Sequence, residues 1–558
     1  MTAPRINGTA RPSRHRSFFS LAAFALVLSA CGREPPDIPP TPVVPTPEQV
    51  AYQEMEILGF VHFSMNTFTD REWGFGDEPA ELFQPMELDT DQWARVAAEV
   101  GMGELILTAK HHDGFTLWPS AFSHHSVSDA PWRDGAGDVV ADFVASARRY
   151  GLKAGLYVSP WDRNHPDYGK EAYLEAYRGQ LTELLTGYGD INEIWVDGAN
   201  GGTGYYGGSN EERRIDRRSY YRWPETMALV KSLQPHTLIF SDAGPDIRWI
   251  GNERGFAGET NWSTIDTDRV VIGEADTDYL NHGDPEGHQW VVPLCDTSIR
   301  PGWFYHPDQD DRVKAPWELV DLYYRSVGRN CVLLLNVPPD RRGRFHEVDV
   351  AALREFRRIL DETFAVNLAA RWTHASTPTV PAGPGTVATP ARPLPTITAD
   401  NVRRGHRKFE ARNVLDGDPS TYWASDDDRR TGVLEIQLPT QATFDRILLQ
   451  EPIRFGQRVS AFVLEIPDGG GWREIARGTT VGQKRILRIP PVKTDRVRLT
   501  IQEALAAPAL SEVGLFRASE DERWESGSPG EDPEERNRWE VRTPAPRVFP
   551  SDPGEGRR

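Results

Sequence analysis

The chain has 558 residues, of which 39% are hydrophobic and 26% charged, so it can bury a large core and is expected to form two or three domains. Its formal net charge of −19 excludes nucleic acid as an expected partner, because the phosphate backbone selects basic surfaces. Neutral sugars and other small molecules are compatible with this charge.

The amino terminus has the pattern of an export signal in residues 1–31. Arginines at 11, 14 and 16 precede an apolar run over 18–30 that is too short to span a bilayer stably. The run ends in Leu28-Ser29-Ala30-Cys31-Gly32, which resembles a bacterial lipobox and implies a lipid on Cys31. A plain cleaved signal with an incidental cysteine is the alternative. Proline-rich residues 32–50 then predict an extended tether. We expect a lipid-anchored protein of the bacterial cell envelope, at the outer membrane or in the periplasm, that touches the membrane through this anchor only.

Residues 51–365 alternate short apolar strands with amphipathic helices. Repeated βα units predict a parallel sheet, and the expected fold is α/β, a closed (β/α)8-type barrel. An open doubly wound sheet is the alternative, which the lack of a glycine-rich nucleotide motif after the first strand disfavours. Strands are expected at 57–63, 105–109, 154–158, around 194, and at 237–240, 270–272, 290–294 and 331–336, with helices at 91–98, 138–150, 173–185, 224–233, 316–327 and 348–360.

The sequence changes character after the barrel. Short alternating runs at 432–438, 446–449, 462–466 and 497–501 predict an all-β sandwich domain over 366–517, with a proline-rich insert at 377–397. Residues 518–558 are acidic and poor in apolar side chains, so we expect a disordered tail. The two cysteines of the exported part, Cys295 and Cys331, stand in apolar surroundings and are expected to be buried thiols rather than a disulfide.

Chemically useful side chains follow five of the predicted strands. In a parallel barrel the carboxyl ends of the strands meet at one pocket, which here would combine indoles, imidazoles, an arginine and at least two carboxylates. For Asp197 alone, the alternative is a carboxylate that merely caps a turn. The strand ends are His62-Phe63-Ser64, Lys110-His111-His112-Asp113-Gly114-Phe115, Tyr157-Val158-Ser159-Pro160-Trp161, Trp195-Val196-Asp197-Gly198 and the stretch from Gly244 to Glu253.

This mixture of side chains suits a sugar. Indole faces stack on the C–H-rich faces of a pyranose, and imidazoles and guanidinium groups hydrogen-bond to hydroxyls. Two carboxylates are what cleavage of a glycosidic bond needs. A metal site at His111 and His112 is the competing interpretation, but adjacent residues on a strand point to opposite faces, so the pair is poorly spaced for one ion.

Several motifs of the barrel resemble those of glycoside hydrolase family 29, the retaining α-L-fucosidases. The resemblance spans about residues 50–365 and implies an exo-enzyme that needs no cofactor for catalysis and acts on fucosylated oligosaccharides or glycoproteins. Gly244-Pro245-Asp246-Ile247-Arg248-Trp249 with Gly251-Asn252-Glu253 resembles the branch acting on α-1,3- and α-1,4-linked fucose. The other motifs are His62-Phe63-Ser64-Met65-Asn66-Thr67-Phe68, Lys110-His111-His112-Asp113-Gly114-Phe115 and Glu193-Ile194-Trp195-Val196-Asp197-Gly198.

The resemblance also implies roles for individual residues. Asp197 would be the nucleophile and Glu253 the general acid/base, with Glu259 in the same loop as the alternative acid/base. Retention requires the two carboxyl groups to lie about 5–5.5 Å apart. The implied contacts to fucose are His62, His111, His112 and Trp195, and further candidates are Trp73, Tyr157, Arg248 and Trp303.

The last group has structural alternatives. Trp73 and Trp303 are equally compatible with packed aromatic side chains, and Arg248 with an ion pair to Asp246. Two other functions also remain open. One is a surface glycan-binding lipoprotein without catalysis. The other is a retaining glycosidase for another 6-deoxy or sulfated sugar, which basic residues in the pocket, such as Arg248 and Lys110, would favour.

The carboxyl-terminal domain resembles discoidin or coagulation factor 5/8 type C domains. The resemblance is carried by the stretch from Asn413 to Ala424, and residues 369–376 would supply the first strand. It implies a structural calcium held by Asp416, Asp418 and Thr421, which suits the preference of that ion for oxygen ligands. An ordinary Asp-Gly-Asp turn is the alternative. Trp423 in this stretch is expected to belong to the core rather than to a sugar platform.

Overall fold

The computed structural model describes residues 34–370 and 393–522. The export signal, Cys31, most of the proline-rich insert and nearly all of the predicted tail lie outside these ranges, as do 371–376 of the predicted first strand of the second domain. The chain divides into a short unit, residues 1–36, and a second unit, residues 37–558, which holds every element discussed below. No helix within the described ranges is long and apolar enough to cross a membrane.

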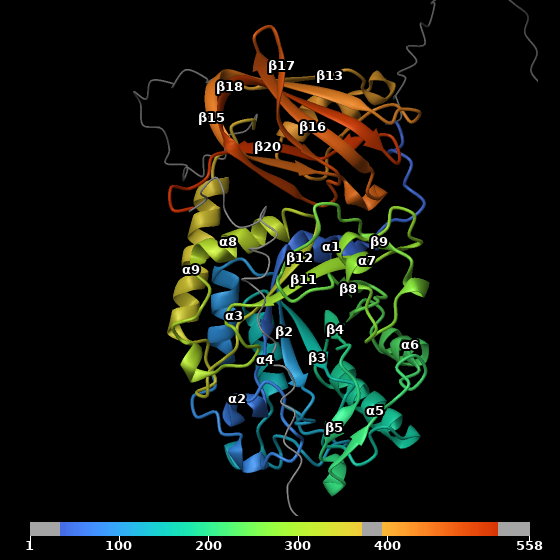
Figure 1. Cartoon of the computed structure of the whole chain (residues 1–558), viewed down its shortest axis with the longest axis vertical. Helices are drawn as coiled ribbons and strands as arrows, with labels where there is room; N and C mark the ends of the chain where they lie inside the picture. The colour runs from blue at the N-terminus through green and yellow to red at the C-terminus, as the bar shows by residue number, and fades with distance from the viewer. Residues whose placement is uncertain (1–33, 371–392, 523–558) are drawn as a thin grey trace, which may run out of the picture. The chain divides into compact units, whose positions relative to one another are not determined.

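Eight parallel strands close into a barrel, which confirms the predicted (β/α)8-type fold (Figure 1). Strand β1 pairs with both β2 and β12, so Phe60 lies beside Ile106 on one side and Asn336 on the other. The barrel strands are β1 (Ile57–Val61), β2 (Glu104–Lys110), β3 (Lys153–Val158), β4 (Glu193–Trp195), β7 (Leu238–Ser241), β8 (Ile247–Trp249), β11 (Val292–Ser298) and β12 (Val332–Asn336).

The sixth barrel strand is not where the sequence predicted it. Residues 270–272 form no strand, and Val271 makes only an isolated bridge to Glu274. The sixth strand is β8, three residues long, inside the stretch that was expected to be a loop. On one side β8 pairs with β11. The N–H of Ile250, the residue after β8, continues this pairing by donating to the Leu294 carbonyl at 3.0 Å. So short a strand has no hydrophobic period that could reveal it.

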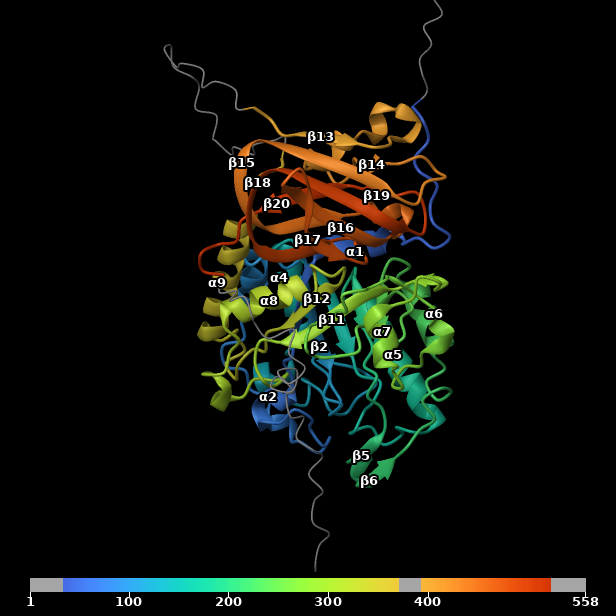
Figure 2. The same ribbon diagram turned by 45° about the horizontal axis from the view of Figure 1, so that its top comes forward.

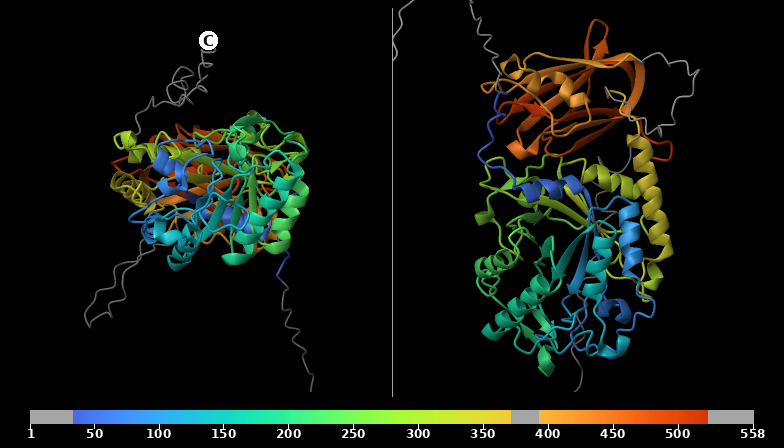
Figure 3. Two further views of the ribbon diagram at one scale, coloured as in Figure 1. Left: turned by 90° about the horizontal axis from the view of Figure 1, so that it is seen from below. Right: turned by 180° about the vertical axis from the view of Figure 1, so that it is seen from behind.

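Helices cover the outside of the barrel (Figures 1 and 3). Some of their amino termini are capped by side chains, as in α4, where the Asp138 carboxylate accepts from Ala141 N–H at 2.8 Å and Val140, Phe143 and Val144 are buried. The helices are α1 (Pro47–Met55), α2 (Met65–Thr69), α3 (Thr90–Glu99), α4 (Val139–Arg149), α5 (Glu171–Gly187), α6 (Trp223–Leu233), α7 (Thr277–His282), α8 (Pro316–Arg325) and α9 (Glu347–Phe364). Two small hairpins, β5 (Gly202–Gly204) with β6 (Glu211–Arg213) and β9 (Thr264–Ile265) with β10 (Gln289–Trp290), lie in the connections.

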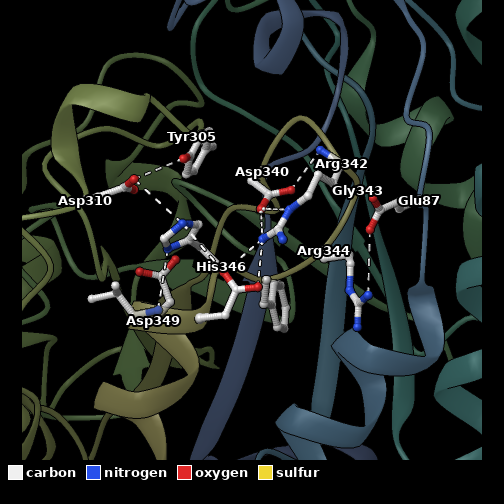
Figure 4. A network of polar contacts seen from close by, with 12 residues as sticks. Glu87, Tyr305, Asp310, Asp340, Arg342, Gly343, Arg344, His346 and Asp349 are labelled. Atoms are coloured by element: carbon white, nitrogen blue, oxygen red, sulfur yellow. Dashed lines mark hydrogen bonds and ion pairs between the residues drawn. The ribbon is translucent and has the colours of Figure 1, made fainter.

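A charged network ties the loops that follow β11 and β12 (Figure 4). Buried Arg300, just after β11, donates to Asp349 of α9 at 2.9 Å and to Asp310 at 2.8 Å. Asp340, after β12, accepts from Arg342 at 2.6 and 2.8 Å. Both loops leave the carboxyl end of the barrel, so the network fixes the backbone on the side where a barrel enzyme places its active site.

The second domain is an antiparallel β-sheet domain, as predicted (Figure 2). Its long strands β15 and β18 pair along most of their length, with a register shift between Gln437 and Ala442. Trp423 is fully buried and donates its indole N–H to the Asn401 carbonyl at 3.0 Å, so it belongs to the core as expected. The strands are β13 (Thr396–Ala399), β14 (Trp423–Ala424), β15 (Gly432–Gln450), β16 (Val459–Asp468), β17 (Gly471–Gly478), β18 (Arg485–Ala504), β19 (Ala509–Leu510) and β20 (Glu512–Phe516).

The described part of the predicted tether is extended but not free. The Asp37 carboxylate accepts from the Tyr422 hydroxyl at 2.6 Å, and Thr41 N–H donates to the Phe455 carbonyl at 3.0 Å. Helix α1 then begins at Pro47, so the last four residues of the predicted tether, 47–50, are helical. These hydrogen bonds hold residues 37–46 against the carboxyl-terminal domain.

The two cysteines form a disulfide, so the prediction of unpaired thiols was wrong. Cys295 lies on β11 and Cys331 directly precedes β12, and their Cα atoms are 6.1 Å apart. Both are buried, as expected from their apolar surroundings. Sequence could not show the pairing, because 36 residues separate them and only the closure of β11 on β12 brings them together.

Candidate active site

Asp197 lies directly beyond β4, at the carboxyl end of the barrel. The Tyr157 hydroxyl donates to its Oδ2 at 2.9 Å, and Ala199 N–H donates to its Oδ1 at 2.6 Å. His112 Nε2 is 3.8 Å from Oδ2. The side chain is 24% exposed, so a ligand can reach a carboxylate whose orientation is already set. Asp197 does cap the following turn, as the alternative held, but Oδ2 faces Tyr157 and His112.

The hydrogen bond from Tyr157 offers a first test of this arrangement. We expect Tyr157→Phe to lower kcat/KM by about 10- to 100-fold, because a hydrogen bond to a charged group contributes about 1.5–3 kcal/mol. Steady-state kinetics measures this. Tyr177→Phe is the matched control, since Tyr177 is also buried but donates to the Val158 carbonyl at 3.1 Å. Equal losses in both variants would mean that Tyr157 acts only through packing.

His62, His111 and His112 lie together at the ends of β1 and β2 and are all buried. Burial lowers the pKa of His62 to about 3 and of His112 to about 4, although the charge of Asp197 opposes the second shift. Burial, and then the neighbouring histidines, lower the pKa of His111 well below its usual range. All three imidazoles are therefore neutral near pH 7, and each offers one nitrogen that donates and one that accepts.

The hydrogen bonds around the histidines assign their tautomers. Asn336 Nδ2 donates to the Trp303 carbonyl at 2.8 Å, so its Oδ1 must accept from His62 Nδ1–H, also at 2.8 Å. The Ser159 hydroxyl donates to the Trp161 carbonyl, so its oxygen accepts from His112 Nδ1–H at 2.7 Å. The Nε2 atoms of His62 and His112 are therefore acceptors.

His111 has the opposite tautomer. Asn66 Nδ2, which also donates to the Glu72 carbonyl at 3.3 Å, donates to His111 Nδ1 at 3.3 Å. His111 Nε2 therefore carries the hydrogen. The Nδ1 atoms of His111 and His112 are both used by protein groups, and among the described residues no three His, Cys, Asp or Glu side chains are grouped to hold a metal ion. The arrangement of two acceptors and one donor suits sugar hydroxyls.

The structure separates the two candidates for the general acid/base. Burial of the Glu253 carboxyl raises its pKa, and the charge of Asp197 raises it further, although the residue as a whole is exposed on its loop. The Glu259 side chain is 63% exposed and paired with Arg329 and Arg485, and these charges lower its pKa although its burial acts in the opposite direction. Of the two, only Glu253 has its pKa raised, by burial and then by the charge of Asp197, which is the direction that a general acid requires.

Aromatic side chains line the same end of the barrel. The Trp303 ring lies 5.0 Å from His62. Its side chain also lies near enough to Glu253 to lower the pKa of that carboxyl, against the effect of burial. The Trp73 ring is 5.2 Å from His112 and 53% exposed, at the rim of the site. Trp195 lies deeper, stacked on Phe240 at 4.0 Å, so it forms the floor beneath Asp197. The structure therefore brings both doubtful indoles, Trp73 and Trp303, to the site rather than into the core.

Arg248 is the one predicted contact that the structure removes from the site. Its side chain is 0% exposed, and its guanidinium donates to the carbonyls of Leu280, Val291 and Trp262. The predicted substrate contact is therefore wrong, and so is the alternative ion pair, because Asp246 pairs with Lys231 at 2.7 Å. The physical reason is strand alternation: in β8 the neighbours of Arg248 face the barrel interior, so its own side chain faces outward.

Sequence reasoning missed two residues of the site, Trp249 and Asp296. Trp249 Nε1 donates to Asp296 Oδ1 at 2.9 Å. Burial raises the pKa of Asp296 well above its usual range, and the charges of Glu253 and Asp197 add to the shift. Asp296 stood just beyond the predicted strand at 290–294. Extending that strand by four residues would have placed it at a strand end beside the other carboxylates.

The predicted calcium residues form a compact turn in the carboxyl-terminal domain. Asp416 accepts from the Thr421 hydroxyl at 2.8 Å and from Asp418 N–H at 3.0 Å, while the exposed Asp418 carboxylate accepts from Ser420 N–H at 2.9 Å. Burial and then the charge of Asp416 raise the pKa of Glu512 to about 8. Carboxylate and hydroxyl oxygens are the ligands that calcium prefers, but this turn offers no group of three His, Cys, Asp or Glu side chains placed to hold a metal ion within the described ranges. Asp418 fits less well, since it is engaged in its own turn.

Comparison with known proteins agrees with this site. The Alpha-L-fucosidase family matches residues 47–362, and the F5/8 type C domain matches 396–512. The chain belongs to the α-L-fucosidases, glycoside hydrolase family 29. It is a glycoside hydrolase whose barrel is followed by an F5/8 type C domain.

Individual relatives resemble the fucosidase over nearly its whole length. The putative alpha-L-fucosidase 1 of Oryza sativa subsp. japonica is 43% identical over 493 residues, 88% of each chain. A crystal structure of a putative alpha-L-fucosidase from Bacteroides thetaiotaomicron has a TM-score of 0.76 at 36% identity and covers 87% of this chain and 100% of its own. A Ruminococcus gnavus GH29 fucosidase in complex with fucose has a TM-score of 0.75 at 29% identity, with 88% and 98% covered.

Proposed function

We propose that this fucosidase is a retaining exo-enzyme that releases α-linked L-fucose through a fucosyl-enzyme intermediate. The observation that carries the proposal is the placement of two carboxyls at one end of the barrel: Asp197 accepts from Tyr157 and from Ala199 N–H, and Glu253 lies near enough for the charge of Asp197 to add to the burial that raises its pKa. One carboxylate oriented by donors, beside one whose pKa is raised, is the division of roles that a two-step displacement needs.

In the first step, the Glu253 carboxylic acid gives its proton to the glycosidic oxygen as the bond from that oxygen to the anomeric carbon breaks. Asp197 forms the new bond to the anomeric carbon, and the aglycone leaves as a neutral alcohol. In the second step, the Glu253 carboxylate takes a proton from water, whose oxygen displaces Asp197 from the anomeric carbon. Glu253 is then protonated again and Asp197 is ionised, so protons and charges balance over the cycle.

The neutral histidines supply binding in this scheme. Two Nε2 acceptors, on His62 and His112, and one Nε2 donor, on His111, can each take one hydroxyl of the sugar. Because none of them is charged near pH 7, they add no positive charge beside Asp197 that would weaken it as a nucleophile. Indoles at the rim offer apolar surface for the methyl group of fucose.

The structure gives no support to the sulfated-sugar alternative. The two basic residues that would favour a sulfated sugar both bind other groups of the protein. Lys110 is fully buried and pairs with Asp162 at 3.2 Å, and Arg248 faces away from the barrel interior. The inactive binding-protein alternative is disfavoured by the coupled carboxyl pair, which sugar binding alone does not require.

The proposed linkage is α-1,3 and α-1,4, and it rests on the motif around Gly244 to Glu253. The test is fucose release from 3-fucosyllactose and 2′-fucosyllactose by a chain that starts after Cys31. ¹H NMR gives the anomeric configuration of the fucose that appears first. Release of α-L-fucose from the 3-linked sugar only is the expected result. A β-anomer would overturn retention, and equal release from both sugars would overturn the linkage. No release from either sugar would favour the binding-protein alternative.

We also propose that the carboxyl-terminal domain holds a structural calcium ion at Asp416, Asp418 and Thr421, with the Glu512 carboxyl nearby. Removing divalent ions with EDTA is expected to lower the Tm of the full chain by a few degrees, and added Ca²⁺ to restore it, because an ion bound only to the folded state stabilises it. Differential scanning fluorimetry measures this. Asp416→Asn should abolish the response. A Tm that is unchanged by EDTA would contradict the site.

The proposed place of action is the cell envelope, by a lipid on Cys31. The proposal rests on the amino-terminal sequence. Metabolic labelling with a fatty-acid analogue, compared between the full chain and Cys31→Ser, tests it directly. Label on the full chain that is absent from the variant is expected, and unlabelled full chain would contradict the anchor.

A further inference from the structure

His306, in the loop after β11, has both ring nitrogens paired with carboxylates. Nδ1 is 2.8 Å from Asp70 Oδ1 and Nε2 is 2.7 Å from Glu72 Oε1. An ionised carboxylate only accepts, so both nitrogens must donate and the ring is an imidazolium. The hydrogen bond to Glu72, and then the one to Asp70, raise the pKa of His306, although burial opposes them. The side chain is 12% exposed, so this pair of contacts is largely enclosed.

The Glu72 carboxylate also accepts hydrogen bonds from main-chain N–H groups of the loop that carries His306. Its Oε2 accepts from Trp303 N–H at 2.9 Å and its Oε1 from Phe304 N–H at 3.4 Å. A Cβ at Gly302 would collide with Glu72 Oε1, so the turn can close on the carboxylate only because residue 302 is glycine. The loop after β1 and the loop after β11 therefore meet at Glu72 and His306. We call this contact the His306 clasp.

Each of the two clasped loops carries an indole of the active site. Trp73 directly follows Glu72 and lies against His112, while Trp303 lies against His62 and beside the Glu253 carboxyl, whose pKa it lowers. The clasp thus joins the two indoles that flank the histidines. His306 itself points at Asp70 and Glu72, and Asp70 is also 3.8 Å from Arg341.

We propose that His306 is a positioning residue that fixes Trp73 and Trp303 relative to each other and so holds Glu253 where it protonates the leaving group. The inference rests on the proposed function. Without the clasp, Trp303 loses the support of the turn around Glu72, and its indole no longer keeps its place beside the Glu253 carboxyl. The three histidines and Asp197 keep side-chain partners outside the clasp. Binding of fucose should therefore depend on the clasp less than protonation of the leaving group does.

The test is His306→Gln, which is neutral and has a donor nitrogen at only one of the two positions that the ring nitrogens of His306 occupy. We expect kcat/KM for 3-fucosyllactose to fall by about 10- to 100-fold, since a displacement of about 1 Å at a catalytic group has effects of this size. For an aryl fucoside with a good leaving group, which needs little protonation, the loss should be less than about threefold. The inhibition constant of free fucose should rise by less than about fivefold, because the histidines keep their side-chain partners and only the apolar contact of the two indoles is disturbed.

His236→Gln is the control variant. His236 is also paired with a carboxylate, that of Glu48 at 2.7 Å, and Glu48 lies in the first turn of α1 rather than in an active-site loop. This variant should leave all three quantities unchanged. Equal losses on both substrates in His306→Gln, or no loss, would overturn the inference. Glu253→Gln in the same assays distinguishes a failure of the clasp inference from a failure of the proposed function. If it shows the leaving-group dependence and His306→Gln does not, only the clasp fails. If Glu253→Gln shows none, the proposed function fails.

Discussion

Asp197→Ala is expected to lower kcat for 3-fucosyllactose by about 10⁴-fold or more, because the variant has no group to form the covalent intermediate. The affinity for free fucose should change much less, since the histidines keep their partners at Asn336, Asn66 and Ser159. Steady-state kinetics and a fucose-binding titration measure the two effects separately. A large loss of kcat with retained fucose binding is the result that a nucleophile gives.

Azide supplies the control for this variant. The space left by the Asp197 side chain can admit a small anion, so azide should restore turnover of an α-fucosyl fluoride and give the β-fucosyl azide. That product has the inverted configuration because azide attacks from the face that Asp197 would have used. Retained activity without azide would contradict the role of Asp197. So would an α-azide as the first product.

Glu253→Gln is expected to show a loss that depends on the leaving group. For oligosaccharides kcat/KM should fall by about 10²- to 10⁴-fold, which is the usual contribution of a positioned general acid. For an aryl fucoside with a good leaving group the first step needs no proton, so slow hydrolysis of the fucosyl-enzyme becomes the limiting step. A burst of the aryl product in pre-steady-state kinetics would show this.

The pH dependence of Glu253→Gln follows from the sign of the shift. Burial and the charge of Asp197 raise the pKa of Glu253, and its protonated form is the one that acts in the first step. Wild-type kcat/KM should therefore fall as the pH rises through that raised pKa, and the variant should lack this alkaline limb. Glu259→Gln is the control, and it should keep wild-type kinetics because Glu259 is paired with Arg329 and Arg485. A normal Glu253→Gln with an impaired Glu259→Gln would reverse the assignment.

The sequence predicted most of the site because its residues stand where strands end. Asp197 was recognisable by an apolar strand that stops at a carboxylate, and His62, His111 and Tyr157 by the same rule on neighbouring strands. The closed barrel was predictable from the βα repeat, and the second domain from alternating runs. In each case the signal is local: hydrophobic period within a window of about ten residues.

The errors came from features that depend on residues far apart in the chain. Strand β8 exists because β7 and β11 pair with it, so the outward direction of Arg248 was hidden as well. Glu259 was separated from Glu253 by its pairing with Arg329 and Arg485, which lie 70 and 226 residues further along the chain. The disulfide between Cys295 and Cys331 depends on the same closure of the barrel. Pairing of this kind has no trace in composition or period.

The most direct test of the mechanism is to trap the intermediate. A 2-deoxy-2-fluoro-fucosyl fluoride should react because fluoride leaves without a proton, and its second fluorine slows the hydrolysis step by destabilising the oxocarbenium-like transition state. Digestion and mass spectrometry of the labelled protein should then find one fluorofucosyl group per chain, on the peptide that contains Asp197. A label on any other residue would contradict the account. Steady hydrolysis of the reagent with no label on the protein would contradict it equally.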